Sequence, residues 1–269
     1  MNRISDYSKL ENRIVFWLKD YACRYSIKAF VIGVSGGIDS AVSSTLAAKT
    51  GLPVYALGMP IHQKEEQETL SDSHLKWLKS NFDNVIVDKF DLTKVFETFK
   101  FSMKEFGTNK HSLANTRSRL RMITLYQVAT SVGGIVVGTG NKVEDYGVGF
   151  YTKYGDGGVD ISPIADLYKT EVWKLGRHFG VDQRIIDASP TDGLWDDGRT
   201  DEDQIGTSYE MLEWVMDSEV MKGGTEFAQT LTQWKGIPIT EEQKVAIRQY
   251  AKFNEQNQHK MNSIPIFKL

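Results

Sequence analysis

The sequence contains few of the features that mark secreted or membrane-bound proteins. Cys23 is the only cysteine among 269 residues, which excludes an intrachain disulfide and a metal site built from several cysteines. No long apolar run occurs, and charged residues interrupt the N-terminal segment, so neither a signal peptide nor a membrane anchor is expected. A single cysteine suits a reducing compartment, and we expect a cytoplasmic protein.

Charge of either sign is also not in large excess. The chain has 32 Lys and Arg residues against 35 Asp and Glu residues, a formal net charge of −3, and an isoelectric point near 6.0. This balance does not favour a surface that wraps nucleic acid or binds an anionic membrane. We therefore expect small-molecule partners, with any phosphate held by a local group of residues.

Short apolar runs alternate with helical patterns along the chain. Strands are expected at residues 29–34, 54–57, 85–87 and 134–138, because these runs lack polar alternation, as strands covered on both faces do. Helices are expected at residues 4–21, 39–50, 65–79, 113–132, 170–179, 209–220 and 241–253, followed by a polar tail. The alternation predicts an α/β fold: a doubly wound parallel sheet with helices on both faces. No linker divides the chain, so residues 1–269 are expected to form one domain.

The most informative motif stands between the first strand and the following helix and reads Ser35-Gly36-Gly37-Ile38-Asp39-Ser40. Glycine amides can approach a phosphate closely, and a helix N-terminus adds unpaired N–H groups and the positive end of its dipole. Asp39 would repel a polyphosphate unless a cation lay between them, which implies Mg²⁺. The motif is neither a Walker A loop nor a dinucleotide-binding fingerprint. An ordinary glycine turn that caps the helix is the alternative.

A second motif leaves the fourth strand and reads Gly138-Thr139-Gly140-Asn141-Lys142-Val143-Glu144. The carboxyl ends of parallel strands meet at one edge of a sheet, so Glu144 could share the cation with Asp39. A helix cap or a surface ion pair is the alternative role for Glu144.

The first motif resembles the loop of the pyrophosphate-loop ATP pyrophosphatases, which have an adenine nucleotide alpha hydrolase-like fold. The resemblance implies cleavage of ATP between its α and β phosphates, with transfer of AMP to a substrate oxygen. It also implies that ATP is bound by Gly33, Val34, Ser35, Gly36, Gly37, Ile38, Asp39 and Ser40.

Within that group, the downstream residues resemble the NAD synthetase family. The likeness rests on residues 149–160 (Gly-Phe-Tyr-Thr-Lys-Tyr-Gly-Asp-Gly-Gly-Val-Asp), 167–171 and 189–191, and it extends over residues 31–260. It implies further ATP contacts at Thr139, Lys169 and Thr191. It also implies a Mg²⁺ site at Asp39 and Glu144, and a catalytic role for Asp39 and Lys169. It implies that deamido-NAD is bound by Arg119, Lys153, Asp160, His259 and Lys260. Arg117 and Arg121 are the alternatives to Arg119. For His259 and Lys260, the alternative is that they belong to a polar tail without a binding role.

The implied reaction is the last step of NAD biosynthesis. An ammonia-dependent ligase of the NAD synthetase type amidates deamido-NAD through an adenylated carboxylate, releases AMP and pyrophosphate, and acts as a homodimer. The phosphate loop begins at residue 35 and no second α/β core follows it, so no glutaminase domain is expected and free ammonia is the donor.

The chain also departs from the commonest form of the family. It has one residue more between Glu144 and Lys153, and Asn141-Lys142-Val143 replaces an Asp-His-Ala-like run. The segment after Thr191, residues 192–195, is only loosely similar. Residues 189–203 are expected to form a closing lid.

Three alternatives stay open at this stage. A tRNA-thiolating enzyme of the same loop family would need paired cysteines or a basic RNA-binding appendage. A GMP-forming enzyme of that family would lack the run from Lys153 to Asp160. A regulatory protein that holds ATP without turnover would not need Asp39 and Glu144 together with a second-substrate segment.

The apolar residues of the helix near 209–220 would suit a subunit interface or a core: Met211, Leu212, Trp214, Val215 and Met216.

Overall fold

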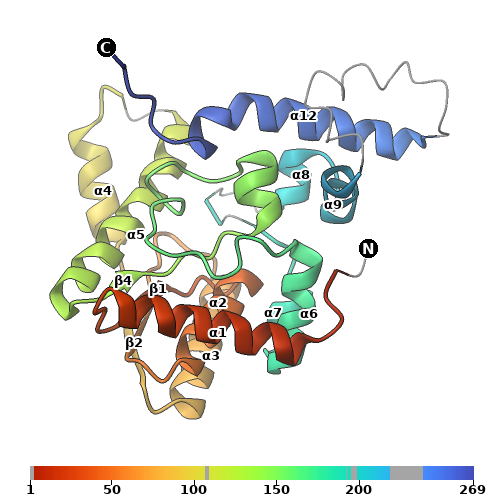
Figure 1. The fold of residues 1–269 in the computed structure, drawn as a ribbon. Helices are drawn as coiled ribbons and strands as arrows, with labels where there is room; N and C mark the ends of the chain where they lie inside the picture. The colour runs from red at the N-terminus through yellow and green to blue at the C-terminus, as the bar shows by residue number, and fades with distance from the viewer. Residues whose placement is uncertain (1–2, 107–108, 192, 195–198, 219–238) are drawn as a thin grey trace.

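The fold is seen in a computed structural model that describes residues 3–106, 109–191, 193–194, 199–218 and 239–269. Its sheet has four parallel strands in the order β3-β2-β1-β4 (Figure 1). The strands are β1 (Phe30–Gly33), β2 (Val54–Gly58), β3 (Val85–Lys89) and β4 (Ile135–Val136). Phe30 of the central strand pairs with Val54 on one side and Ile135 on the other. The predicted α/β fold with a parallel sheet is confirmed. The strand β4 has two residues, whereas the strand expected there spans residues 134–138.

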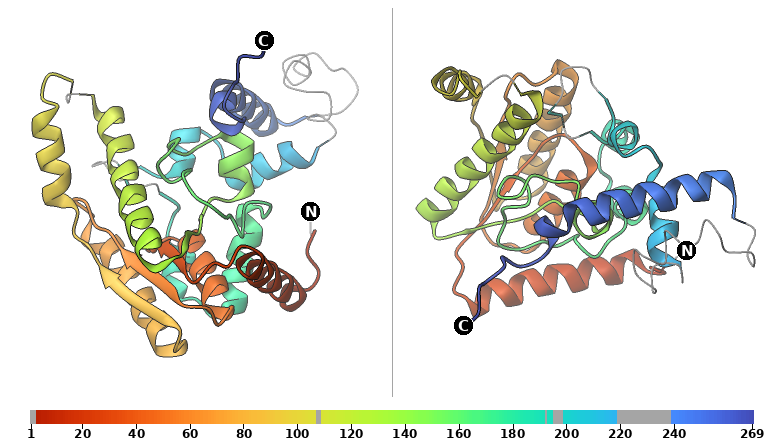
Figure 2. Two further views of the ribbon diagram at one scale, coloured as in Figure 1. Left: turned by 60° about the vertical axis from the view of Figure 1, so that its left-hand side comes forward. Right: turned by 90° about the horizontal axis from the view of Figure 1, so that it is seen from above.

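Helices cover both faces of the sheet (Figure 2). Alternate side chains of β1 point to opposite sides, since Phe30 and Ile32 belong to one buried cluster and Val31 to another. The first cluster includes residues of α1 (Tyr7–Arg24), α2 (Ile38–Lys49), α3 (Glu65–Asn81) and α6 (Lys169–Phe179). The second includes residues of α4 (Thr93–Ser102) and α5 (Lys110–Val132). This is the doubly wound arrangement that the alternating pattern predicts.

A smaller cluster stands beside the sheet, under the long helix at the top of Figure 1. It is built by the π-helix η1 (Val143–Val148) and by α8 (Asp201–Ile205), α9 (Tyr209–Asp217) and α12 (Glu241–Met261). Leu212 and Val215 of α9 are fully buried in it, and Met211, Trp214 and Met216 pack against it. The apolar face of α9 is therefore part of this core, with Leu212 and Val215 buried within the chain itself.

The sequence-based expectation for the C-terminus was wrong, because α12 continues to Met261 where a polar tail was expected after residue 253. Two polar side chains of this half of the helix bind the backbone of η1: Asn254 donates to the Gly147 carbonyl at 2.7 Å and Asn257 to the Val148 carbonyl at 2.8 Å. These tertiary bonds stabilise a helical segment that lacks an apolar pattern. His259 and Lys260 thus lie in the last turn of a helix.

Among the described residues, three α-helices were not expected from the sequence, namely α4 and the short helices α7 (Gln183–Asp187) and α8, and the π-helix η1 was not expected either. α4 is fixed by Phe96, which is buried beneath α5. None of the helices in the described part of the chain combines the length and apolar character that a bilayer crossing requires.

Candidate functional site

A pocket of about 670 Å³ opens at the carboxyl ends of β1 and β4. Its floor is the phosphate loop, residues 35–40, which joins β1 to α2. Its walls include residues 62–64, 66 and 67, residues 139, 140, 144 and 145 after β4, Lys169 at the start of α6, and residues 188–191 with Gly193. Several segments that are distant in the sequence therefore meet at the sheet edge where ligands of doubly wound folds bind.

The phosphate loop depends on a glycine at position 36. Gly36 has a φ of +89°, and a Cβ built there would lie 2.7 Å from the Gln67 carbonyl oxygen and 2.9 Å from the Ser71 nitrogen. Both facts exclude a larger residue without a shift of α3. The hydroxyls brace the loop from inside: Ser40 Oγ donates to the Gly37 carbonyl at 2.9 Å and lies 3.1 Å from Ser35 Oγ. No side chain caps the N-terminus of α2 at Gly37, so its first-turn amides face the pocket.

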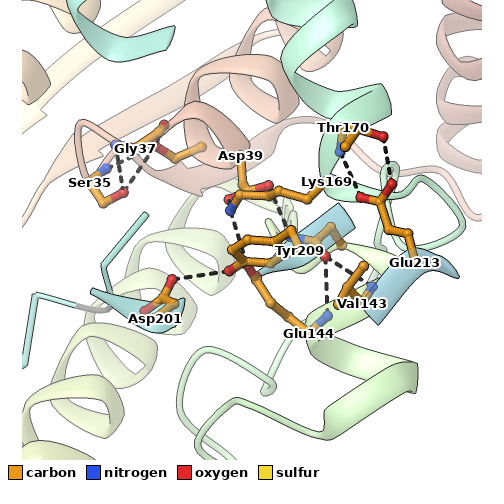
Figure 3. A network of polar contacts seen from close by, with 12 residues as sticks. Ser35, Gly37, Asp39, Val143, Glu144, Lys169, Thr170, Asp201, Tyr209 and Glu213 are labelled. Carbon is orange, nitrogen blue, oxygen red and sulfur yellow. Dashed lines mark hydrogen bonds and ion pairs between the residues drawn. The ribbon is translucent and has the colours of Figure 1, made fainter. Parts of the chain in front are cut away.

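The centre of the pocket is an ion-paired group around Lys169 (Figure 3). The Lys169 ammonium lies 2.5 Å from Asp39 Oδ2 and 3.0 Å from Glu144 Oε1. Its side chain is only 2% exposed, compared with 17% for Asp39 and 15% for Glu144. The sequence-predicted metal carboxylates therefore come together, with the predicted catalytic lysine between them.

Asn141 holds both carboxylates in place. Its amide nitrogen donates to Asp39 Oδ1 at 3.2 Å, and its amide oxygen accepts from the backbone nitrogens of Val143 and Glu144 at 3.0 and 3.1 Å. Asn141 is fully buried. One side chain thus ties the first turn of α2 to the first turn of η1.

Burial and pairing shift the ionisation of this group. Burial alone would lower the pKa of Lys169, but Asp39 and Glu144 outweigh it and raise that pKa above its ordinary value. Burial raises the pKa of Asp39, against the opposing effect of Lys169. For Glu144, burial is outweighed by Lys169 and by the hydrogen bond from Tyr209, and its pKa is lowered. Lys169 is therefore a permanent ammonium ion at neutral pH.

The donor set fits a Mg²⁺ ion that arrives with a phosphate ligand. Both carboxylates contact one ammonium nitrogen, so their oxygens lie close enough to share a cation. Within the described residues, no group of three or more His, Cys, Asp and Glu side chains is placed to hold a metal ion. Mg²⁺ needs only one or two carboxylates when phosphate and water oxygens complete its shell, and Asp39 and Glu144 meet that requirement.

Most of the predicted ATP-binding residues line this pocket, including Thr139, Lys169, Thr191 and all of residues 35–40. Gly33 ends β1, and the Val34 side chain is buried in the first core cluster, so these two residues lie behind the loop. Part of the expected lid, residues 192 and 195–198, lies outside the described residues. Of the described residues of that segment, Ser189, Pro190, Thr191, Gly193, Thr200 and Asp201 line the pocket.

Four of the five predicted deamido-NAD residues form a cluster beside the pocket. Arg119 donates to the Lys153 carbonyl oxygen at 3.3 Å, and Lys153 Nζ donates to the His259 carbonyl oxygen at 2.7 Å. Lys260 Nζ donates to the carbonyl oxygen of Tyr151, a residue that lines the pocket, at 2.8 Å. The C-terminal pair is thus brought to the other substrate residues by the unexpected length of α12.

The fifth residue, Asp160, lies apart from this cluster. Its carboxylate accepts hydrogen bonds from the Tyr126 hydroxyl at 2.9 Å and from the backbone nitrogen of Val136 at 2.8 Å. Tyr126 stands seven residues along α5 from Arg119, about 10 Å at 1.5 Å per residue. Asp160 therefore caps the short strand β4, and its role in binding substrate stays a prediction.

The three arginines of α5 reach three different places. Arg117 donates to the Leu194 carbonyl oxygen at 2.6 Å and lines the pocket. Arg121 donates to the Met59 carbonyl oxygen at 3.0 Å, beyond the end of β2. Only Arg119 joins the Lys153 cluster, which is the placement expected for it.

The segment between Glu144 and Lys153, where the chain is one residue longer than the commonest form of the family, begins in the π-helix η1. A π-helix contains more residues per turn than an α-helix and often marks a functional site. Here it spans Val143–Val148 and ends at Gly149, whose φ is +62°. With this backbone, the Glu144 carboxylate accepts a hydrogen bond from Lys169 Nζ at 3.0 Å.

Sequence reasoning missed two residues of this group, Tyr209 and Asp201. The Tyr209 hydroxyl donates to Glu144 Oε1 at 2.6 Å and lies 3.2 Å from Asp201 Oδ2 (Figure 3). Burial raises the pKa of Tyr209 well above its ordinary value, and nearby Glu144 and Asp201 add to this effect, so the phenol stays a hydrogen-bond donor.

Comparison with known proteins gives consistent results. The NAD synthase family matches residues 10–263. An NH(3)-dependent NAD(+) synthetase of Methanosarcina acetivorans is 34% identical over 270 residues, which cover 97% of this chain and 98% of the relative. The structure of an NMN synthetase from Francisella tularensis is 31% identical, with a TM-score of 0.84 and coverage of 99% of this chain and 100% of that one.

A second solved structure supports the fold alone. It is an NH3-dependent NAD synthetase from Campylobacter jejuni, which is 22% identical with a TM-score of 0.74 and covers 98% of this chain and 100% of its own. A family match over residues 10–263 and 34% identity along nearly the whole chain show that this protein belongs to the NAD synthase family, a family of ligases.

Proposed function

We propose that this protein amidates the nicotinate carboxylate of deamido-NAD, using ATP and free ammonia and releasing NAD, AMP and pyrophosphate. A carboxylate does not accept ammonia at neutral pH, so one of its oxygens first bonds to the α-phosphorus of ATP while the bond from that phosphorus to pyrophosphate breaks. Ammonia then attacks the acyl carbon of the adenylate, AMP departs with the former carboxylate oxygen, and the nitrogen loses a proton. The naming of the curated relative supports this proposal.

The observation that carries the proposal is the ion-paired group at the N-terminus of α2. The first-turn amides of α2 bind phosphate oxygens, and Lys169 is a buried ammonium ion on the pocket wall. When bound, Mg²⁺ would neutralise charge on the reacting phosphates, and Asp39 and Glu144 are the residues that would hold it. No side-chain nucleophile is needed, because positioning and charge neutralisation perform the chemistry.

The cationic cluster beside the pocket is the proposed site for deamido-NAD. Arg119, Lys153 and Lys260 bring three positive charges next to Tyr151, which lines the pocket. The substrate phosphates would replace backbone carbonyls as partners of these side chains.

We also propose a cytoplasmic homodimer. The surface around Arg119 carries large apolar side chains, with Ile123 58% exposed and Tyr154 52% exposed. Only Ala114, Ser118 and Ala129 of the long helix α5 are buried, which leaves much of its surface for a second copy. Light scattering of the purified protein tests this assembly.

A second candidate is the same amidation carried out on a mononucleotide. The structure of the F. tularensis NMN synthetase supports it, because that chain is covered completely at a TM-score of 0.84. The Lys169 group would perform the same two steps, and only recognition of the AMP half of deamido-NAD would be dispensable. The relative rates with nicotinate mononucleotide and deamido-NAD decide between the two substrates.

The test is incubation with ATP, Mg²⁺, one of the two nicotinate substrates, and either ammonium or glutamine. Equal yields of AMP and amidated product with ammonium alone are expected. Asp39→Asn should abolish both products, whereas Asp83→Asn, which changes an exposed carboxylate, should leave them unchanged. ATP binding without either product would favour a regulatory nucleotide-binding protein instead.

A further inference from the structure

Tyr209 is placed to control the carboxylate of Glu144. Its side chain is fully buried, and its hydroxyl lies 2.6 Å from Glu144 Oε1. The Lys169 ammonium lies 5.0 Å from the centre of the Tyr209 ring, so the same residue faces the carboxylate and its counter-ion. Neither contact reaches into the substrate cluster around Lys153.

The phenol is fixed from both ends. Tyr209 is the first residue of α9, and its backbone nitrogen donates to Glu202 Oε1 at 2.9 Å. Ser208 caps the same helix by accepting from the Met211 nitrogen at 3.3 Å. The ring packs in the cluster under α12 and meets Trp173 edge-on at 6.0 Å between centroids. The hydroxyl therefore has one accessible position, set by the packing of α9.

Glu144 needs such support because its own backbone is irregular. It lies in the π-helix η1, whose first turn is held by Asn141. A carboxylate only accepts hydrogen bonds, and a phenol has one proton to give, so Tyr209 can serve only one of its two acidic neighbours at a time. The shorter distance is to Glu144, since the oxygen of Asp201 lies at 3.2 Å.

Asp201 connects this contact to the wall of the pocket. Its backbone nitrogen donates to the Pro190 carbonyl oxygen at 2.9 Å, next to the predicted ATP contact Thr191. Thr191 is itself held through a bond from its hydroxyl to the Arg199 carbonyl oxygen at 3.1 Å. A hydrogen-bonded path therefore leads from Pro190 through Asp201 and the Tyr209 hydroxyl to Glu144.

We propose that Tyr209 is a positioning residue for metal binding. Its hydroxyl holds the Glu144 carboxylate in the orientation that receives Mg²⁺, and it links this carboxylate to Asp201, which is bonded to the pocket wall at Pro190. The proposal rests on the proposed function, in which Glu144 is a ligand of Mg²⁺. Groups that orient a metal ligand in this way typically contribute a factor of 10 to 100 in metal affinity.

The test compares two buried tyrosines of the same cluster. Tyr209→Phe removes only the hydroxyl that reaches Glu144, and Tyr250→Phe removes a hydroxyl that faces Asn254 at 3.5 Å. Binding of Mn²⁺ in the presence of a non-hydrolysable ATP analogue is followed by electron paramagnetic resonance. Tyr209→Phe is expected to raise the Mn²⁺ dissociation constant about 10-fold, and Tyr250→Phe to leave it unchanged. Melting temperatures are measured first, and binding is read well below the lowest of them.

Glu144→Gln gives the scale of the effect, and activity assays give a second readout. The Mg²⁺ concentration for half-maximal product formation should rise in Tyr209→Phe, with the maximal rate largely recovered at high Mg²⁺. The proposal fails if Tyr209→Phe binds Mn²⁺ like the wild type. If Glu144→Gln also binds Mn²⁺ normally, the metal assignment falls together with the proposal. The binding assay needs no nicotinate substrate, so an error in the proposed reaction would show separately, as normal metal binding without product.

Discussion

Replacing Lys169 with methionine should destabilise the protein far more than the loss of a surface charge would. The lysine is 2% exposed and neutralises two carboxylates that are themselves largely buried. Removing one partner of a buried ion pair leaves an uncompensated charge and typically costs about 3–5 kcal/mol. Because Lys169 has two such partners, the upper part of that range is expected. Urea unfolding followed by circular dichroism measures the change as a shift in midpoint at constant slope.

The matched control is Lys142→Met, a change within the motif that carries Glu144. Lys142 pairs with Asp166, whose side chain is 89% exposed, and such surface pairs contribute about 0–1 kcal/mol. A stronger control neutralises the whole group at once. The triple variant Lys169→Met, Asp39→Asn, Glu144→Gln should be more stable than Lys169→Met alone, because it leaves no buried charge unpaired. A Lys169→Met protein as stable as Lys142→Met, or a triple variant no more stable than the single one, would refute this account of the site.

Three further results are expected. Gly36→Ala should weaken ATP binding at least about tenfold in calorimetry, because the new Cβ would meet the backbone of α3. The control is Gly51→Ala, at a residue with a φ of +77° but open space around it. This control should lose only about 1–3 kcal/mol of stability and should bind ATP normally. Burial lowers the pKa of His74 to about 4 from 6.5, so the unfolded chain binds more protons between these values and the stability of the fold should fall by up to roughly 3 kcal/mol as the pH drops from 6.5 to 4. That loss should be absent from His74→Gln, and parallel stability curves for the two proteins would contradict it. Chelation of divalent metal with EDTA should stop both AMP and product formation until Mg²⁺ is restored, and continued AMP formation would argue against a metal role for Asp39 and Glu144.

Much of the fold follows from local pattern. The parallel sheet was predictable because its strands are continuous apolar runs, and α2 and α5 were predictable because glycines follow both of them, at positions 51 and 133. The extent of α12 was not, since it depends on Asn254 and Asn257 reaching the backbone of η1. Tertiary hydrogen bonds of this kind leave no periodic signal in the sequence.

The candidate site divides in the same way. Asp39 and Glu144 could be brought together from the sequence because their motifs follow strands whose carboxyl ends meet at one sheet edge, whereas Lys169 was added by the resemblance to the NAD synthetase family. Tyr209 could not, because an aromatic residue in an apolar helical pattern indicates core, and only the direction of its hydroxyl distinguishes it.

The three arginines of α5 also fix the position of this helix relative to three other segments of the chain. Arg117, Arg119 and Arg121 fasten, in turn, the segment at Leu194, the loop at Lys153 and the end of β2 at Met59. Successive members of the set differ by about 200° in direction and 3 Å in height, as helix geometry requires. Inserting a single residue before Arg117 would turn all three side chains by about 100° and detach three segments at once. Changes in the length of α5 should therefore be far less tolerated than changes in the identity of its exposed residues.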